Sequence, residues 1–105
     1  MLGEGMELAI LLDTYEKLLT ETQVKILRMR YDEDLSLGEI GEILGISRQA
    51  VRNTIIKGEE KLHYYEEIFK IISREREINK IAEMLSQSPE TIKYSEMLKK
   101  VTEEM

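Results

Sequence analysis

The sequence predicts an all-α protein, in which a small helical head with a helix-turn-helix precedes long C-terminal helices. Apolar residues recur three and four positions apart along nearly the whole chain, as they do in amphipathic helices. The single proline is Pro89, and no β-branched runs stand between turn signals. We expect a head over residues 1–62, and a helical extension over residues 63–105 that serves dimerisation.

The first predicted helix has one apolar stripe, and we expect the segment MLGEG before Met6 to be its frayed extension. The stripe comprises Leu8, Leu11, Leu12, Tyr15, Leu18 and Leu19. Thr20 is then expected to cap a second helix, because Gln23 three residues later completes a capping box. The expected buried face of this helix comprises Val24, Leu27 and Tyr31. The polar segment YDEDLS ends it.

The segment SLGEIGEILGISRQAVRNTI, residues 36–55, has the spacing of a helix-turn-helix. Ser36 and Glu39 form a second capping box at its start. The inward face of the first helix is expected to comprise Leu37, Ile40 and Leu44. Gly41 stands where two helices must approach closely, and Gly45 stands where the turn needs a positive φ. The alternative is an ordinary helical hairpin.

The second helix of this motif has its own boundary and core signals. Ile46 is expected to fill the core behind the turn. Ser47 is expected to cap the helix, and Val51 to pack back against the preceding one. The helix would then place its polar side chains outward, where they can meet a ligand.

The outward face of this second helix carries residue types that recognise nucleic acids. At 100° per residue the outward side chains are Gln49, Arg52, Asn53, Ile56 and Lys57. Arg48 lies at the positive end of the helix dipole, where phosphates bind. Arg, Gln and Asn can read base edges, and Arg and Lys can neutralise phosphates. The candidate nucleic-acid-binding residues are therefore Ser47, Arg48, Gln49, Arg52, Asn53 and Lys57. The simpler alternative is a solvated helix face.

The charge distribution argues against tight, autonomous DNA binding. The formal net charge is −6. Residues 36–61 carry four basic and four acidic side chains, so the motif itself is neutral. DNA-binding domains are usually distinctly basic, because phosphate neutralisation supplies much of the affinity. Glu60 lies on the outward face with Asn53 and would repel a phosphate there.

Several segments together resemble one bacterial family. These are YEKLLTETQVKILRMRYDEDLSLGEIGEILGISRQAV and the later EEKLHYYEEIF. They are similar to the YlxM family, whose members are similar to region four of sigma factors and are associated with the signal recognition particle. The resemblance covers roughly residues 8–72. It implies a helical helix-turn-helix protein that regulates the particle's pathway by contacting the particle or its RNA.

The C-terminal part indicates a protein partner. A heptad-like seam with alternating steps of four and three comprises Val51, Ile55, Gly58, Leu62, Tyr65, Phe69 and Ile72. Gly58 is expected to mark a kink or to let another helix come close. A further apolar face comprises Ile71, Ile78, Ile81 and Leu85. We expect a homodimer that buries Phe69 and Ile72, and the alternative is an intramolecular helical hairpin.

The last helix is expected to begin at Pro89, with Ser88 as its cap. Its inner face would comprise Ile92, Met97, Leu98 and Val101.

No constellation of residues indicates catalysis, a metal or a cofactor. His63 is the only histidine, and there is no cysteine, so neither a zinc site nor a nucleophile–base pair can be assembled. No apolar run reaches the roughly 18 residues of a membrane span. We therefore expect a cytoplasmic protein that is not an enzyme.

Two functions remain open. One is a regulator in the signal recognition particle pathway that binds structured RNA or the particle. The other is a transcription regulator that reads the DNA major groove through Arg48, Gln49, Arg52 and Asn53. The neutral charge of the motif favours the first function. The complete turn signals, followed by Ser47, Arg48 and Gln49 at the start of the second helix, favour the second function.

Overall fold

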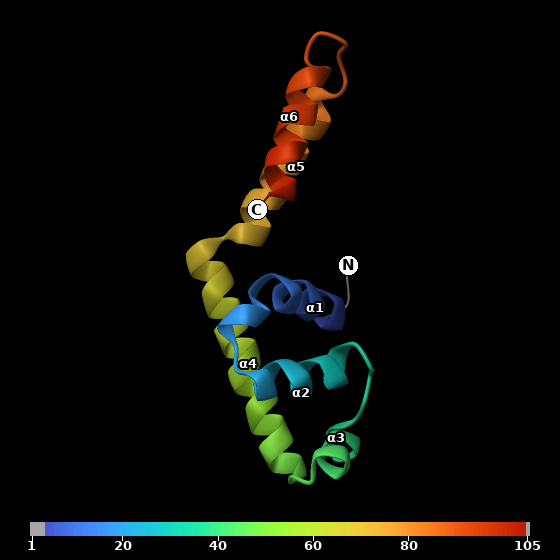
Figure 1. Ribbon diagram of the computed structural model, residues 1–105, viewed down its shortest axis with the longest axis vertical. Coiled ribbons are helices and arrows are strands. Elements are labelled where there is room, and N and C mark those ends of the chain that lie inside the picture. Colours follow the sequence, from blue (N-terminus) through green and yellow to red (C-terminus); the bar gives the residue numbers. More distant parts are fainter. Residues whose placement is uncertain (1–3, 105) are drawn as a thin grey trace. The chain divides into compact units, whose positions relative to one another are not determined.

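The computed structural model describes residues 4–104 and divides into two compact units, one ending at Ile68 and one starting at Phe69 (Figure 1). The helices are α1 (Glu4–Tyr15), the 3-10 helix η1 (Glu16–Leu18), α2 (Glu21–Tyr31), α3 (Leu37–Leu44), α4 (Arg48–Phe69), α5 (Ile71–Leu85) and α6 (Ile92–Glu103). The described residues contain no strand, which confirms the predicted all-α class. The boundary expected after residue 62 falls inside α4.

The expected frayed extension before Met6 lies only partly in the described residues. Residues 1–3 lie outside the described residues. Glu4 and Gly5 already belong to α1, so the helix begins before Met6, the residue at which we expected the frayed extension to end.

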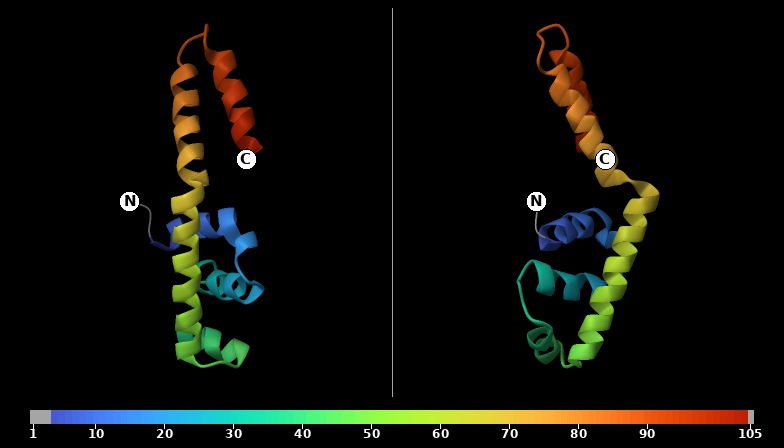
Figure 2. Two further views of the ribbon diagram at one scale, coloured as in Figure 1. Left: turned by 90° about the vertical axis from the view of Figure 1, so that its left-hand side faces the viewer. Right: turned by 180° about the vertical axis from the view of Figure 1, so that it is seen from behind.

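The first unit packs α1, α2 and α3 against the long helix α4 (Figures 1 and 2). Its buried apolar side chains are Leu8, Leu11, Leu12, Tyr15, Ile26, Leu27, Met29, Ile40, Val51, Ile55 and Leu62. The ring of Tyr15 lies 6.1 Å from that of Tyr65, and its hydroxyl donates a 2.5 Å hydrogen bond to Glu66 on α4. These contacts fasten the end of α1 to α4.

Both predicted stripes of the first two helices need correction. Leu18 is 49% exposed, because the chain tightens into η1 after Tyr15 and leaves the α-helical register. In α2 the buried side chains include Ile26 and Met29 beside Leu27, whereas Val24 and Tyr31 are only half-buried. The buried arc of α2 is wide because this helix meets α1, α3 and, through Leu27, Gly58 of α4.

The predicted capping box of α2 is confirmed. The Thr20 hydroxyl accepts from the Gln23 backbone N–H at 3.1 Å, and the Gln23 side chain accepts from the Thr20 N–H at 3.0 Å. Two of the donors that a helix start leaves without partners are thereby satisfied.

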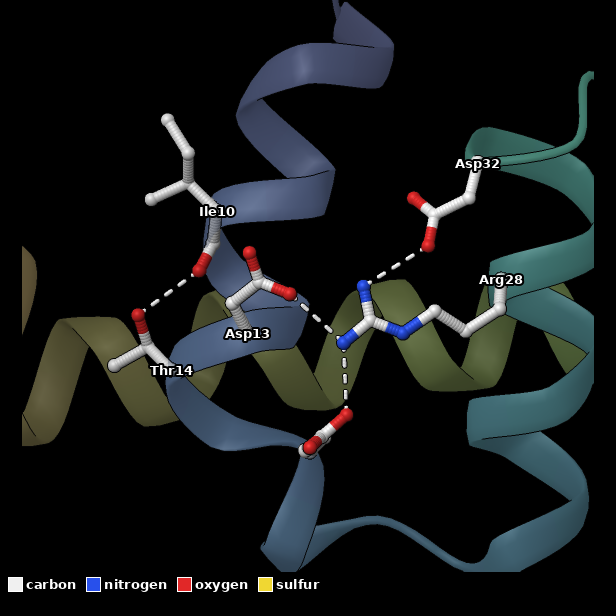
Figure 3. Close-up of polar contacts among 6 residues, drawn as sticks. Ile10, Asp13, Thr14, Arg28 and Asp32 are labelled. Carbon is white, nitrogen blue, oxygen red and sulfur yellow. Dashed lines mark hydrogen bonds and ion pairs between the residues drawn. The ribbon is translucent and has the colours of Figure 1, made fainter.

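One guanidinium joins α1, η1 and α2 (Figure 3). Arg28 lies 2.8 Å from both Asp13 and Glu16, and 3.1 Å from Asp32. The pKa of Arg28 is raised, first by the hydrogen bond with Glu16 and further by those with Asp13 and Asp32. Arg28 therefore stays charged and offsets part of the repulsion among three carboxylates.

The heptad-like seam does not run on as one helix, contrary to the prediction. The helix α4 ends at Phe69, and Lys70 adopts a left-handed conformation with φ 54°. Ile72 therefore belongs to a different helix. Gly58 does let another helix come close, as predicted, because a Cβ there would lie 2.8 Å from Leu27.

The second unit is an antiparallel hairpin of α5 and α6 (Figure 2). Its helices meet through small side chains, with Ala82 and Ser95 almost fully buried. The intramolecular hairpin, which the sequence left as an alternative, is thus present. The structure contains one chain and leaves the homodimer a prediction.

The start of α6 differs from the prediction. This helix begins at Ile92, because the Ser88 carbonyl accepts from the Thr91 and Ile92 N–H groups in a preceding turn that includes Pro89. The Thr91 hydroxyl also donates to the Leu85 carbonyl at 2.6 Å.

The predicted inner face of α6 is wrong in most positions. Ile92, Met97 and Val101 are exposed, whereas Leu98 is half-buried. The face turned to α5 is centred on Ser95, because a small side chain allows the two helices to approach closely.

Candidate nucleic-acid interface

The turn between α3 and α4 has the geometry that the sequence predicts. The Ser36 hydroxyl accepts from the Glu39 N–H at 3.1 Å, while the Glu39 carboxylate accepts from the Ser36 N–H at 3.0 Å. At the other end of α3, Gly45 has φ 71°, a conformation that glycine adopts at little cost. The N–H groups of Gly45 and Ile46 both point to the Gly41 carbonyl, closing the helix end.

Gly41 is the position at which the turn touches α3. It is buried, and a Cβ there would lie 2.7 Å from the Ile46 carbonyl oxygen and 3.6 Å from the Arg48 nitrogen. The close approach is therefore between α3 and the backbone of the turn, not between two helices as predicted. The Ile46 side chain does not fill the core, since it is 39% exposed.

Ser47 sets the start of α4, as predicted. Its hydroxyl oxygen accepts from the Ala50 N–H at 3.0 Å, and its carbonyl accepts from the Val51 N–H at 3.1 Å. Val51 is fully buried and anchors the first turn of α4 in the head. The direction in which this turn projects its side chains is thereby fixed.

The six predicted site residues lie at the cap and in the first half of α4. All six are exposed: Ser47, Arg48, Gln49, Arg52, Asn53 and Lys57. Ile56, predicted to lie outward with them, is half-buried. Arg48, Arg52 and Lys57 form no ion pair with another described residue. Three cations therefore face solvent on a short stretch of helix.

Two of the polar side chains are bonded to each other. The Gln49 Nε2 donates to the Asn53 Oδ1 at 3.0 Å, one helical turn away. A bidentate contact with adenine needs both the amide oxygen and the amide nitrogen of one side chain. The bond uses one of the two Gln49 amide hydrogens and one of the two lone pairs of the Asn53 oxygen, so either side chain can keep it while contacting a base, and the bond fixes their relative orientation.

Both acidic and apolar side chains lie near Arg48, Arg52 and Lys57. Glu42 and Glu60 are exposed nearby in the sequence, whereas the Glu59 carboxylate accepts from the Tyr31 hydroxyl. Ile43 was missed by the sequence reasoning and is 62% exposed on α3. Helical periodicity could have identified it, because Ile43 does not lie on the predicted inward face of Leu37, Ile40 and Leu44. Together with Ile46 it gives the turn two exposed apolar side chains.

Other classes of site receive little support from the described residues. No group of three or more His, Cys, Asp or Glu side chains among them could hold a metal ion. None of the described helices has the length and apolar character needed to cross a bilayer.

The sequence matches a family of known proteins. Residues 2–102 match the model of the UPF0122 family, described as "Putative helix-turn-helix protein, YlxM / p13 like". A UPF0122 protein of Halalkalibacterium halodurans is 34% identical over 105 residues, covering 100% of this chain and 96% of the relative. One of Desulforamulus reducens is 36% identical over 110 residues, covering 95% and 94%. One of Thermoanaerobacter sp. (strain X514) is 38% identical over 89 residues, covering 85% and 76%.

Proposed function

Because the chain belongs to the UPF0122 family of YlxM / p13-like helix-turn-helix proteins, we propose that it binds nucleic acid through the start of α4. The observation that carries this proposal is that Arg48, Arg52 and Lys57 are all exposed in the first half of α4, whose start Ser47 caps. Oriented backbone N–H groups and cations at one helix end together favour phosphate.

The partner that we propose is a structured RNA in the signal recognition particle pathway, or its protein complex, and the protein acts there as a non-enzymatic regulator. The resemblance of the sequence to signal-recognition-particle-associated proteins supports this choice. So does the charge of the first unit, in which residues 1–68 carry eight lysines and arginines against fourteen aspartates and glutamates. An acidic body weakens non-specific binding to duplex DNA, which depends on phosphate neutralisation.

The second candidate is a transcription regulator that reads duplex DNA. It is favoured by the complete helix-turn-helix geometry, with Gly45 at positive φ and the recognition side chains outward. Arg48 and Arg52 would contact guanine or phosphate, and the exposed Ile43 and Ile46 would suit thymine methyl groups. The distinction between the two candidates lies in the ligand, not in the surface used.

The test is a competition assay with fluorescently labelled signal recognition particle RNA and unlabelled duplex DNA of mixed sequence. The expected result is that RNA binds at physiological salt and that DNA displaces it poorly. Arg48→Ala and Arg52→Ala should each weaken binding, and each lost phosphate contact should reduce the salt slope by about one unit. A lost base contact would instead cost roughly 1–3 kcal/mol at one position of the ligand.

The matched control is Lys25→Ala, which removes one exposed cation from α2, away from the turn. It should leave affinity nearly unchanged. Equal losses in all three variants would mean that only overall charge matters. Tight, sequence-specific DNA binding would reverse the order of the two candidates, and unchanged binding in both arginine variants would remove the start of α4 from the mechanism.

A further inference from the structure

The hairpin of α5 and α6 has almost no core of its own. Among its described residues only Ala82 and Ser95 are buried, and both side chains are small. Burial of large apolar side chains supplies most of the free energy that stabilises a fold. Ile78, Leu85 and Leu98 are only half-buried, and several other large apolar side chains of the hairpin are exposed.

Those larger side chains lie mainly on one side of the hairpin. With Ala82 and Ser95 facing each other, the helical rotation of 100° per residue places Ile81, Tyr94 and Val101 on the same side. They are 43%, 47% and 52% exposed. Met84 and Met97, at 68% and 63%, stand at the outer edges of this side. We refer to these five residues as the apolar face.

The opposite side of the hairpin is polar. The same rotation places there the side chains of Asn79, Glu83, Glu96, Lys99 and Glu103, and Ile92 is the one large exposed apolar residue on this side among residues 69–104. The hairpin as a whole carries seven lysines and arginines and seven glutamates over residues 69–105. A nucleic acid would meet no excess of positive charge here, and another copy of the hairpin would meet no net repulsion.

We propose that the apolar face is covered by the apolar face of a second copy of this chain, so that two hairpins form a four-helix bundle. Helices of such bundles pack close to antiparallel around apolar residues. The five side chains expose roughly 500 Å² per copy, so the pair would bury at most on the order of 1,000 Å², the lower limit for a specific interface.

The charges at the two ends of the face favour one orientation. Arg74 lies on this side near the start of α5, and Glu90 lies at the other end of the hairpin, in the turn that joins α5 to α6. When two copies pack head to tail, the end of one hairpin that carries Arg74 lies beside the end of the other that carries Glu90. When like ends meet, Arg74 faces Arg74, and like charges destabilise the contact. The second copy is therefore antiparallel to the first.

The test uses two isoleucines of nearly equal exposure, measured in the full-length chain. Ile81 is 43% exposed on the apolar face, and Ile92 is 44% exposed on the opposite side. Sedimentation equilibrium at micromolar concentration should give twice 12.3 kDa for the unchanged protein and for Ile92→Glu, but 12.3 kDa for Ile81→Glu. Circular dichroism should show unchanged helix content in both variants.

The orientation is tested by charge exchange. Arg74→Glu should weaken self-association, and adding Glu90→Arg should restore it, since these residues lie at opposite ends of one hairpin and can meet only between copies. If Ile81→Glu loses helix content, Val101→Glu on the neighbouring helix carries the test. A monomeric unchanged protein, a dimeric Ile81→Glu that keeps its helices, or dissociation by Ile92→Glu overturns the proposal. Failure of restoration overturns the antiparallel arrangement, and none of these results bears on nucleic-acid binding by α4.

Discussion

Replacing Gly41 by alanine should destabilise the turn that positions the recognition helix. The new Cβ would lie 2.7 Å from the Ile46 carbonyl oxygen and 3.6 Å from the Arg48 nitrogen. Both neighbours are backbone atoms, so no side chain can rotate away and the turn itself must shift. Overpacking of this kind costs about 1–3 kcal/mol.

Alanine also has an intrinsic advantage, because glycine in a helix is up to about 1 kcal/mol less favourable. Gly38→Ala in the same helix isolates this gain. A Cβ at Gly38 meets only the Ser36 hydroxyl oxygen, at 3.9 Å. We expect Gly38→Ala to be neutral or stabilising and Gly41→Ala to be destabilising, with a difference of about 1–3 kcal/mol between them.

The measurement is urea unfolding of both variants and of the unchanged protein, followed by circular dichroism. In thermal unfolding, 1 kcal/mol corresponds to roughly 4–8 °C for a unit of this size. If Gly41→Ala is as stable as Gly38→Ala, the close approach of the turn to α3 does not constrain the fold, and the reasoning fails.

Two further predictions concern other local features. Lys70→Gly should raise the free energy of unfolding by up to about 1 kcal/mol in urea melts, because Lys70 has φ 54°, whereas Lys70→Ala removes the same charge without relieving the backbone and should give no gain. The pKa of Glu39 is lowered, first by the Ser36 backbone N–H and then by its hydroxyl, so an NMR titration should place it below the ordinary value. The ionised carboxylate therefore stabilises α3 above the ordinary pKa, and this contribution is lost as the pH falls through the lowered one. Ser36→Ala should move the pKa of Glu39 part of the way back toward its ordinary value, because the backbone N–H remains, and a pKa that stays unchanged would contradict the contribution of the Ser36 hydroxyl.

Features set by residues a few positions apart were predictable from the sequence. The caps at Thr20, Ser36 and Ser47 are confirmed, as is the positive φ of Gly45. Each depends on a hydrogen bond or a backbone angle within one turn of chain. Such interactions are specified locally, so one sequence suffices to identify them.

Features that depend on distant neighbours were predicted less well. Leu18 lies off the core because η1 interrupts the helical register after Tyr15. The break at Lys70 has no glycine or proline to mark it. The inner face of α6 is centred on Ser95 because it packs against Ala82, a pairing that the apolar pattern alone does not indicate.

For the candidate site, the exposure of Gln49, Arg52, Asn53 and Lys57 follows from helical periodicity once Val51 is known to be buried, whereas Ser47 and Arg48 are exposed at the start of the helix. The hydrogen bond between Gln49 and Asn53 could not be predicted from periodicity, because it depends on the rotamers of both side chains. The residue pattern also does not distinguish RNA from DNA, since arginine, glutamine and asparagine can contact either.

The most direct test of the central claim is chemical-shift mapping of the ¹⁵N-labelled full-length protein during titration with signal recognition particle RNA. If the start of α4 is the nucleic-acid surface, the largest changes should fall on the backbone amides of residues 47–57, and Arg48→Ala should reduce them. Changes concentrated on α5 and α6, with residues 47–57 unaffected at saturation, would contradict the proposed interface.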